Sequence, residues 1–286
     1  MMKKTLPVLT LALAIPGLAQ GDPEVMWVQS GFDQPESVVS DADGAHLYVS
    51  SIHGQPGEKN AQGYISKLSN DGQVIDKHWV NGLNAPKGMG IQGGQLFVTD
   101  IDRFLVIDLV SGEVLEQFFP PQAQFLNDVS VSDDGDVYVS DMMGNAIYRY
   151  DGEALTLWLE DERLMHPNGV LADEDSLLVA GWGAPIAADF STEEAGSLLR
   201  IGFQDKALTR VAGGERLGNL DGVARIGDQL LANDWMNGRL FRITADGQGT
   251  VAAELAPGVA DIGAAGDVLY LPYMFDGEVR AVRMLK

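Results

Sequence analysis

The feature that most constrains the fold of this chain is a short motif that recurs six times. Each copy places one polar residue directly before a short apolar stretch. The six polar positions are Glu36, Lys87, Asn127, Asn168, Asp221 and Asp261. Their spacings are 51, 40, 41, 53 and 40 residues. Such a period predicts structural repeats of ~40–50 residues, in which each unit buries its apolar face against its neighbours.

Every copy is followed by the same order of short strands and turns. In the third unit, β-branched and aromatic residues alternate with small or polar ones in four segments, residues 129–132, 137–141, 146–150 and 155–159. The segments are separated by Asp134-Gly135, Gly144-Asn145 and Asp151-Gly152. These pairs supply the positive φ angles that tight hairpin turns require. The unit is therefore predicted to be a four-stranded antiparallel meander.

Six such units and no amphipathic helical run predict an all-β fold, a single six-bladed β-propeller over residues 20–286. Length alone would also permit two ordinary domains. The two long spacings coincide with insertions at residues 52–62 and 181–195. The last unit lacks a fourth strand, and we expect residues 25–28 to supply it and so close the ring.

The first 19 residues have the composition of a cleaved secretory signal. Lys3 and Lys4 precede an apolar stretch that ends in small residues at Gly17 and Ala19. We therefore expect a soluble, monomeric protein in the periplasm or secreted from the cell, with no membrane partner. The chain has no cysteine, which excludes disulfides and thiolate metal sites.

The formal net charge of −22 argues against a nucleic-acid partner, because phosphate binding needs clustered Lys and Arg, and the 19 basic residues form no run. A solvated acidic surface and a field that gathers cations are both compatible with this charge.

The recurring polar position is expected to form a ring. The first strand of each propeller blade lines the central channel, so the residues that open these strands project into one shared space. Glu36, Asn127, Asn168 and Asp221 offer two carboxylates and two amide carbonyls, and such hard oxygen ligands suit Ca²⁺ better than Zn²⁺ or Cu²⁺. The alternative is that Asn168-Gly169 and Asp221-Gly222 are ordinary turn pairs.

The motifs Pro35-Glu36, Leu126-Asn127-Asp128, Pro167-Asn168-Gly169 and Leu220-Asp221-Gly222 resemble the calcium-binding set of the gluconolactonase and regucalcin-like (senescence marker protein) family. The similarity extends to the paraoxonases and diisopropylfluorophosphatase, and it covers the mature chain at the level of the blade pattern. It implies a six-bladed fold, a divalent cation, usually Ca²⁺, in the channel, and hydrolysis of lactones or related esters.

From this predicted site we infer roles for single residues. Glu36, Asn168 and Asp221 would hold the metal, with Asn127 as a fourth ligand or a substrate contact. The metal would polarise the lactone carbonyl. Asp221 is the first candidate for the base that orients or deprotonates the attacking water. Lys87 would hold the carboxylate product or another ligand oxygen.

Two ring positions depart from the family pattern. Lys87 stands where paraoxonase-like members present a histidine, so a histidine proton relay is not carried over. His53 and His166 lie in a loop and ahead of a turn, and we expect them to be solvated or structural. Asp261 would add a third carboxylate that binds a second ion, pairs with Lys87 or faces channel water.

Residues that follow each second strand are expected to rim one mouth of the channel. They are Ile52, Met142, Trp182, Trp235 and Met274. An apolar wall of this kind favours a lactone or ester with hydrophobic bulk over a polar sugar acid. Packing between blades is an equally good interpretation of each residue alone.

The alternative function is a non-catalytic exported propeller that binds a ligand or a protein, because the fold does not decide between the classes.

Overall fold

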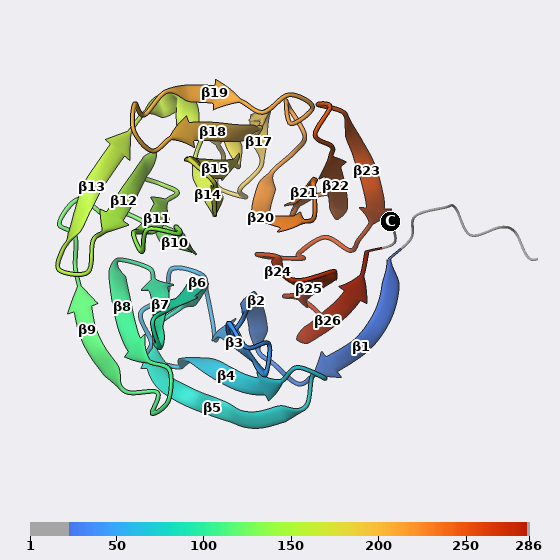
Figure 1. Cartoon of the computed structure of the whole chain (residues 1–286). Coiled ribbons are helices and arrows are strands. Elements are labelled where there is room, and N and C mark those ends of the chain that lie inside the picture. Colours follow the sequence, from blue (N-terminus) through green and yellow to red (C-terminus); the bar gives the residue numbers. More distant parts are fainter. Residues whose placement is uncertain (1–22, 285–286) are drawn as a thin grey trace, which may run out of the picture.

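The computed structural model describes residues 23–284 and confirms the predicted all-β propeller. These residues form six four-stranded antiparallel sheets around a central axis (Figure 1). Within them the only helix is the 3₁₀ helix η1 (Glu162–Leu164), so no described helix is long and apolar enough to cross a membrane. The expected signal segment, residues 1–19, lies outside the described residues.

The first three blades follow one another along the chain, each running outward from the axis. Blade 1 contains β2 (Gln34–Ser40), β3 (His46–Ile52), β4 (Gly63–Ser69) and β5 (Val74–Leu83). Blade 2 contains β6 (Pro86–Gln92), β7 (Gln95–Asp100), β8 (Arg103–Asp108) and β9 (Val114–Phe118). Blade 3 contains β10 (Leu126–Val131), β11 (Val137–Asp141), β12 (Ala146–Tyr150) and β13 (Leu155–Glu160).

Blade 4 carries an extra hairpin between its second and third strands. The blade contains β14 (Pro167–Asp173), β15 (Ser176–Gly181), β18 (Leu198–Gly202) and β19 (Leu208–Arg210), and the hairpin is β16 (Gly183–Ile186) with β17 (Thr192–Ala195). Blade 5 contains β20 (Leu220–Ile226), β21 (Gln229–Asp234), β22 (Arg239–Ile243) and β23 (Gly249–Glu254). The hairpin occupies the second predicted insertion.

Blade 6 is shared between the two ends of the described chain. It contains β24 (Gly263–Ala265), β25 (Val268–Tyr273) and β26 (Glu278–Arg283), and its outer strand is β1 (Glu24–Ser30). Strand β1 pairs antiparallel with β26, with Val28 opposite Arg280. The predicted closure of the ring by residues 25–28 is therefore confirmed, and Figure 1 shows β1 beside β26.

The core consists of apolar layers between neighbouring blades. Between blades 2 and 3, for example, Phe97 and Phe104 lie in one buried cluster with Val139 and Tyr148. Comparable clusters fill the other five junctions. Burying one large apolar side chain contributes about 1.5–3 kcal/mol. Because each blade buries its faces only against its neighbours, the inner strands are held in place by the whole ring.

Acidic residues at the ends of second strands hold the segments that lead into the inner strands. The buried Asp100 carboxylate accepts hydrogen bonds from the backbone amides of Asn84 (2.9 Å) and Ala85 (2.7 Å). Asp141 accepts in the same way from the amides of Gln124 (2.9 Å) and Phe125 (2.8 Å). These two aspartates therefore have structural partners, and they fix where the inner strands β6 and β10 begin.

Candidate functional site

The polar ring is built by irregularities in the inner strands. The pairing register shifts between Pro35 and Ser37, and equivalent shifts lie between residues 86 and 89, 126 and 129, 167 and 170, and 220 and 223. A β-bulge bends the strand and re-aims the bulged side chain. The first residues inside these shifts are Glu36, Lys87, Asn127, Asn168 and Asp221, all of which are buried.

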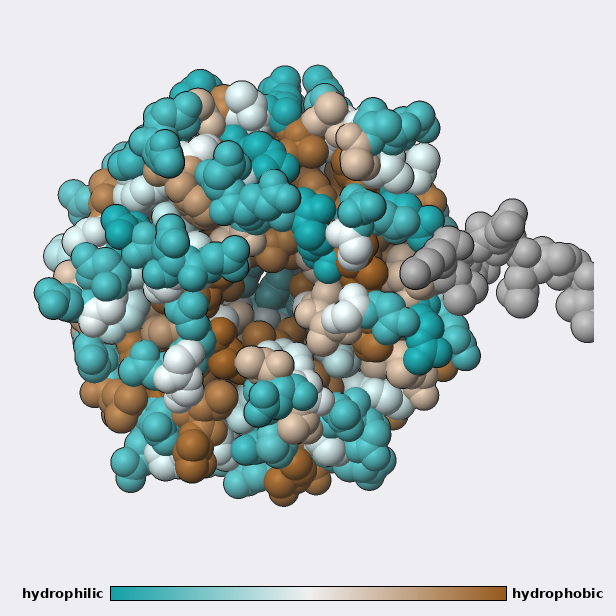
Figure 2. Space-filling view, viewed as in Figure 1, coloured by the Kyte–Doolittle hydropathy of each residue, from teal (hydrophilic) through white to brown (hydrophobic). Residues whose placement is uncertain are grey.

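These five side chains line one cavity of about 110 Å³ on the channel axis. The space-filling view shows a hollow at the centre of the ring (Figure 2). The other lining residues are Ile52, Pro56, Phe125, Met142, Trp182, Phe190, Trp235 and Met274. The structure thus brings together the four predicted metal-site residues, Lys87 and all five predicted rim residues.

Two oxygens of the ring lack a hydrogen-bond partner within the described part of the chain. They are Oε2 of Glu36 and Oδ1 of Asn168, and both are fully buried. A buried polar atom without a partner costs about 1–3 kcal/mol, so such atoms in a cavity indicate a ligand. The two oxygens come from blades 1 and 4, on opposite sides of the same cavity, and belong to the predicted metal set.

The donor set fits a hard divalent cation. Within residues 23–284, no three or more His, Cys, Asp or Glu side chains are grouped to hold a metal ion, so a cation here would also need the amide oxygens. The cavity offers two carboxylates and two side-chain amides, and two of their oxygens have no hydrogen-bond partner. This set matches the oxygen coordination of Ca²⁺.

Burial shifts the pKa values of the ring carboxyl groups. Burial raises the pKa of Glu36 well above its usual range, the Lys87 ammonium lowers it, and the carboxylates of Asp221 and Asp261 raise it further. Burial also raises the pKa of Asp221, and Asp261 adds to this effect. A bound divalent cation would act in the opposite direction, because it favours the ionised carboxylates.

Lys87 is fixed by backbone oxygens. Its Nζ donates hydrogen bonds to the carbonyls of Pro56 (2.8 Å) and Ala85 (3.1 Å) and lies 4.7 Å from the centre of the Phe125 ring. Burial lowers the pKa of Lys87 to about 8, and the Glu36 carboxylate opposes this shift. An ammonium has three donors, so one N–H is left over after these two bonds.

Aromatic side chains form one wall of the cavity. The rings of Trp182 and Trp235 lie 5.9 Å apart, and Phe275 packs 5.2 Å from Trp235. The Trp182 indole Nε1 donates to the Phe190 carbonyl (2.8 Å), which ties the segment between β16 and β17 to the wall. The predicted rim residues therefore both pack with one another and face the cavity.

Sequence reasoning missed three lining residues, Pro56, Phe125 and Phe190. Pro56 and Phe190 lie in the two insertions, and Phe125 lies in the loop before β10. None of the three has a counterpart in the repeating motif, so the alignment of repeats carried no signal for them. Both insertions nevertheless reach the same mouth of the channel.

The predicted ring position of Asp261 is wrong by one residue. Val259 pairs with Tyr273, the last residue of β25, just as Leu220 pairs with Asp234 at the end of β21. Ala260 therefore occupies the ring position, and Asp261 falls one residue beyond it. Asp261 forms a parallel bridge with Ser37 and does not line the cavity described above.

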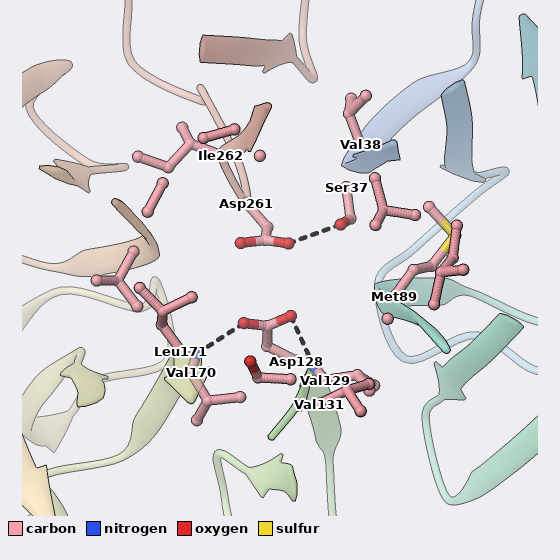
Figure 3. A pocket seen from close by; sticks show the side chains of 18 of the residues that line it. Ser37, Val38, Met89, Asp128, Val129, Val131, Val170, Leu171, Asp261 and Ile262 are labelled. Carbon is pink, nitrogen blue, oxygen red and sulfur yellow. Dashed lines mark hydrogen bonds between the residues drawn. The ribbon is translucent and has the colours of Figure 1, made fainter. Parts of the chain in front are cut away.

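Asp261 instead faces Asp128 in a second channel cavity of about 290 Å³ (Figure 3). Asp261 Oδ2 accepts a hydrogen bond from Ser37 Oγ (2.6 Å), and the Asp128 carboxylate accepts from the amides of Val129 and Val170 (both 2.6 Å). Asp128 was missed because it stands next to the more conspicuous Asn127.

The two facing carboxyl groups have perturbed acidities. Burial raises the pKa of Asp128 well above its usual range, and the Asp261 charge adds to this. Burial raises the pKa of Asp261 to about 6, although hydrogen bonding with Ser37 and Asp128 lowers it. Like charges in contact disfavour simultaneous ionisation, so the pair is expected to share a proton.

Neither of the two nearby histidines lines the cavity. His166 Nδ1 lies 3.0 Å from the Met142 carbonyl oxygen, and His53 Nδ1 lies 3.7 Å from an Asp33 carboxylate oxygen with both side chains about half exposed. These contacts agree with the expected structural and solvated roles.

Comparisons with known proteins identify the fold. No protein-family model and no curated protein sequence matches the chain. A solved structure of a protein provisionally named a gluconolactonase is 16% identical, covers 93% of each chain and has a TM-score of 0.65. A catalytically inactive variant of virginiamycin B lyase from Staphylococcus aureus, bound to quinupristin, is 14% identical over 91% of this chain and 99% of its own, with a TM-score of 0.60.

A chain of a nidogen–laminin complex is also similar. It is 16% identical, covers 74% of this chain and 82% of its own, and has a TM-score of 0.59. At these identities the likenesses establish the propeller fold alone. The fold carries several functions, so the function must be argued from the site.

Proposed function

We propose that the protein is a calcium-dependent hydrolase of lactones or related esters. The observation that carries this proposal is the convergence of Glu36, Asn127, Asn168 and Asp221 on one cavity, where Glu36 Oε2 and Asn168 Oδ1 have no partner. These four residues would hold Ca²⁺, which when bound supplies Lewis-acid polarisation of a carbonyl oxygen. The resemblance to the gluconolactonase family supports the same reaction class.

The chain's own residues account for the remaining steps. Asp221 orients a water molecule and accepts its proton while the water oxygen bonds to the carbonyl carbon. The ester C–O bond then breaks, and the proton passes to the leaving alkoxide, so a lactone yields a hydroxy acid. Lys87 uses its third N–H for the carboxylate product. Asn127 is either the fourth calcium ligand or a contact for the substrate.

The cavity wall favours a substrate with an apolar body. Trp182, Trp235 and Met274 present few polar atoms, so the hydroxyl groups of a sugar lactone would lose water without gaining partners. An aryl ester or an alkyl-substituted lactone would instead bury apolar surface against these side chains. We therefore rank such substrates above glucono-δ-lactone.

A substrate panel tests the proposed function. The chain from residue 20 onward is assayed with phenyl acetate, an alkyl-substituted δ-lactone and glucono-δ-lactone, in calcium and in a chelator. We expect calcium-dependent hydrolysis of the first two and weak hydrolysis of the third. Calcium binding with no turnover of any ester or lactone would contradict the enzymatic proposal.

The second candidate is a ligand-binding propeller without catalysis. The Lys87 ammonium favours this second candidate. It is held by two carbonyl oxygens, and its charge offsets part of the negative charge with which the ring would bind a catalytic metal ion. The nidogen–laminin complex shows that a similar fold takes part in a protein complex. The panel separates the two candidates, because this alternative expects no hydrolysis.

A further inference from the structure

Buried polar side chains on the second strands form hydrogen bonds that hold the bulges of the inner strands. Those of Thr99, Ser140 and Asn233 also reach the next blade, whereas Ser50 accepts only from the Ser37 amide of its own blade. These four residues occupy the same position in blades 1, 2, 3 and 5. Their side chains are fully buried. The equivalent residue in blade 4 is Ala180, which has no polar atom in its side chain.

Ser140 shows the arrangement most clearly. Its Oγ accepts a hydrogen bond from the Asp128 amide (2.8 Å) within blade 3 and donates one to the Asn168 carbonyl (2.6 Å) of blade 4. One hydroxyl therefore fixes two bulges at once. Thr99 likewise donates to the Asn127 carbonyl, from blade 2 to blade 3.

Asn233 does the same with an amide. Its Oδ1 accepts from the Gly222 amide (2.9 Å), and its Nδ2 donates to the carbonyls of Val259 (2.7 Å) and Ala260 (3.1 Å). At the junction between blades 4 and 5, where Ala180 offers no polar side chain, the two backbones lie close together, since a Cβ on Gly169 would lie 2.1 Å from the Asp221 carbonyl oxygen.

We infer that Ser140 and Thr99 are positioning residues that hold the two amide side chains of the ring, Asn168 and Asn127, in their binding geometry. The inference rests on the proposed calcium site. A bulge leaves its residue outside the regular ladder, so the backbone at Asn168 needs another anchor, and the Ser140 hydroxyl provides it. Loss of such a supporting bond typically weakens metal binding about 10- to 100-fold.

The test compares three variants. Ser140→Ala removes both bonds, and Ser140→Thr retains the hydroxyl in a residue type that the equivalent position of blade 2 already carries. Ser66→Ala is the matched control, because it deletes a buried hydroxyl that donates to the Lys77 carbonyl (2.7 Å) far from the ring. Calcium affinity is measured by isothermal titration, and thermal stability is measured in a chelator.

We expect Ser140→Ala to raise the calcium Kd about tenfold, whereas Ser140→Thr and Ser66→Ala stay within about twofold of the parent. Both alanine variants should lower the melting temperature, Ser140→Ala by more because it loses two hydrogen bonds and Ser66→Ala loses one. Equal calcium affinity in Ser140→Ala and the parent, or an equal loss in Ser66→Ala, would overturn the inference.

A second readout keeps the inference separate from the proposed function. If the parent chain binds no calcium, the metal proposal fails, and hydrogen exchange of the peptide covering β14 decides the positioning role. Faster exchange of that peptide in Ser140→Ala alone supports it. Unchanged exchange in Ser140→Ala, or the same acceleration in Ser66→Ala, refutes it.

Discussion

The Lys87 ammonium donates a 2.8 Å hydrogen bond to the Pro56 carbonyl, so a residue of the ring is tied directly to the insertion at residues 52–62. The same ammonium favours the ionised form of Glu36. Lys87 therefore interacts both with the Glu36 carboxylate of the ring and with the insertion that contains Pro56.

Replacing Lys87 with methionine should strengthen calcium binding, because it removes a positive charge from the ring. We expect the Kd for Ca²⁺ to fall about three- to tenfold. The melting temperature in a chelator should also fall, since the Pro56 and Ala85 carbonyls lose their donor. Lys59→Met is the control, because Lys59 lies in the same insertion but pairs with Asp102 at the surface (2.5 Å). Weaker calcium binding by Lys87→Met would contradict this role.

Gly169→Ala should destabilise the protein by about 3 kcal/mol. A Cβ at this position would lie 2.1 Å from the Asp221 carbonyl oxygen, and two inner strands would have to separate. Urea denaturation measures the effect. Gly57→Ala serves as the control because its Cβ would meet only a Phe125 ring carbon at 3.9 Å. Equal stability of the two variants would show that the strands tolerate separation at this junction.

The Asp128–Asp261 pair should make the metal-free protein less stable as the pH rises from about 4 to about 6. The folded-state pKa of Asp261 is raised from 3.8 to about 6, so the folded state binds the proton more tightly than the unfolded state does. The stabilisation that protonated Asp261 gives the folded state is fully present below pH 3.8. It is lost as the pH rises through the folded-state pKa, which lowers the free energy of unfolding by up to about 3 kcal/mol.

Asp261→Asn tests this pH dependence, because an amide does not titrate. Melting temperatures in a chelator should change less with pH in this variant than in the parent. Asp228→Asn makes the same change of charge at an exposed hairpin turn and should leave the parent's pH dependence intact. An unaltered pH profile in Asp261→Asn would assign the effect to other groups.

The fold and the ring could be predicted from sequence because both repeat. Asp-Gly pairs fixed the hairpins, and Asn168 and Asp221 were recognisable by their register with Glu36. Blade 6 was the exception. The sequence does not show where β25 ends, so Asp261 was aligned with the ring residues although Ala260 occupies that position.

Features without a repeat could not be predicted. Phe190 reaches the cavity from a hairpin that occurs only in blade 4, and the Trp182 indole fixes it there through a backbone carbonyl. The support by Ser140 was hidden for a different reason. Its position does recur in other blades, but a buried serine on a second strand is indistinguishable in sequence from a small core residue.

The central claim is that the ring binds Ca²⁺ through Glu36, and calorimetric titration of the parent chain and of Glu36→Gln tests it most directly. Glutamine keeps the size of the side chain but removes the charge of the unpartnered Oε2. We predict one calcium ion per parent chain and at least about 30-fold weaker binding by the variant, as expected from loss of a charged ligand. No calcium binding by the parent, or equal affinity in the two proteins, would contradict it.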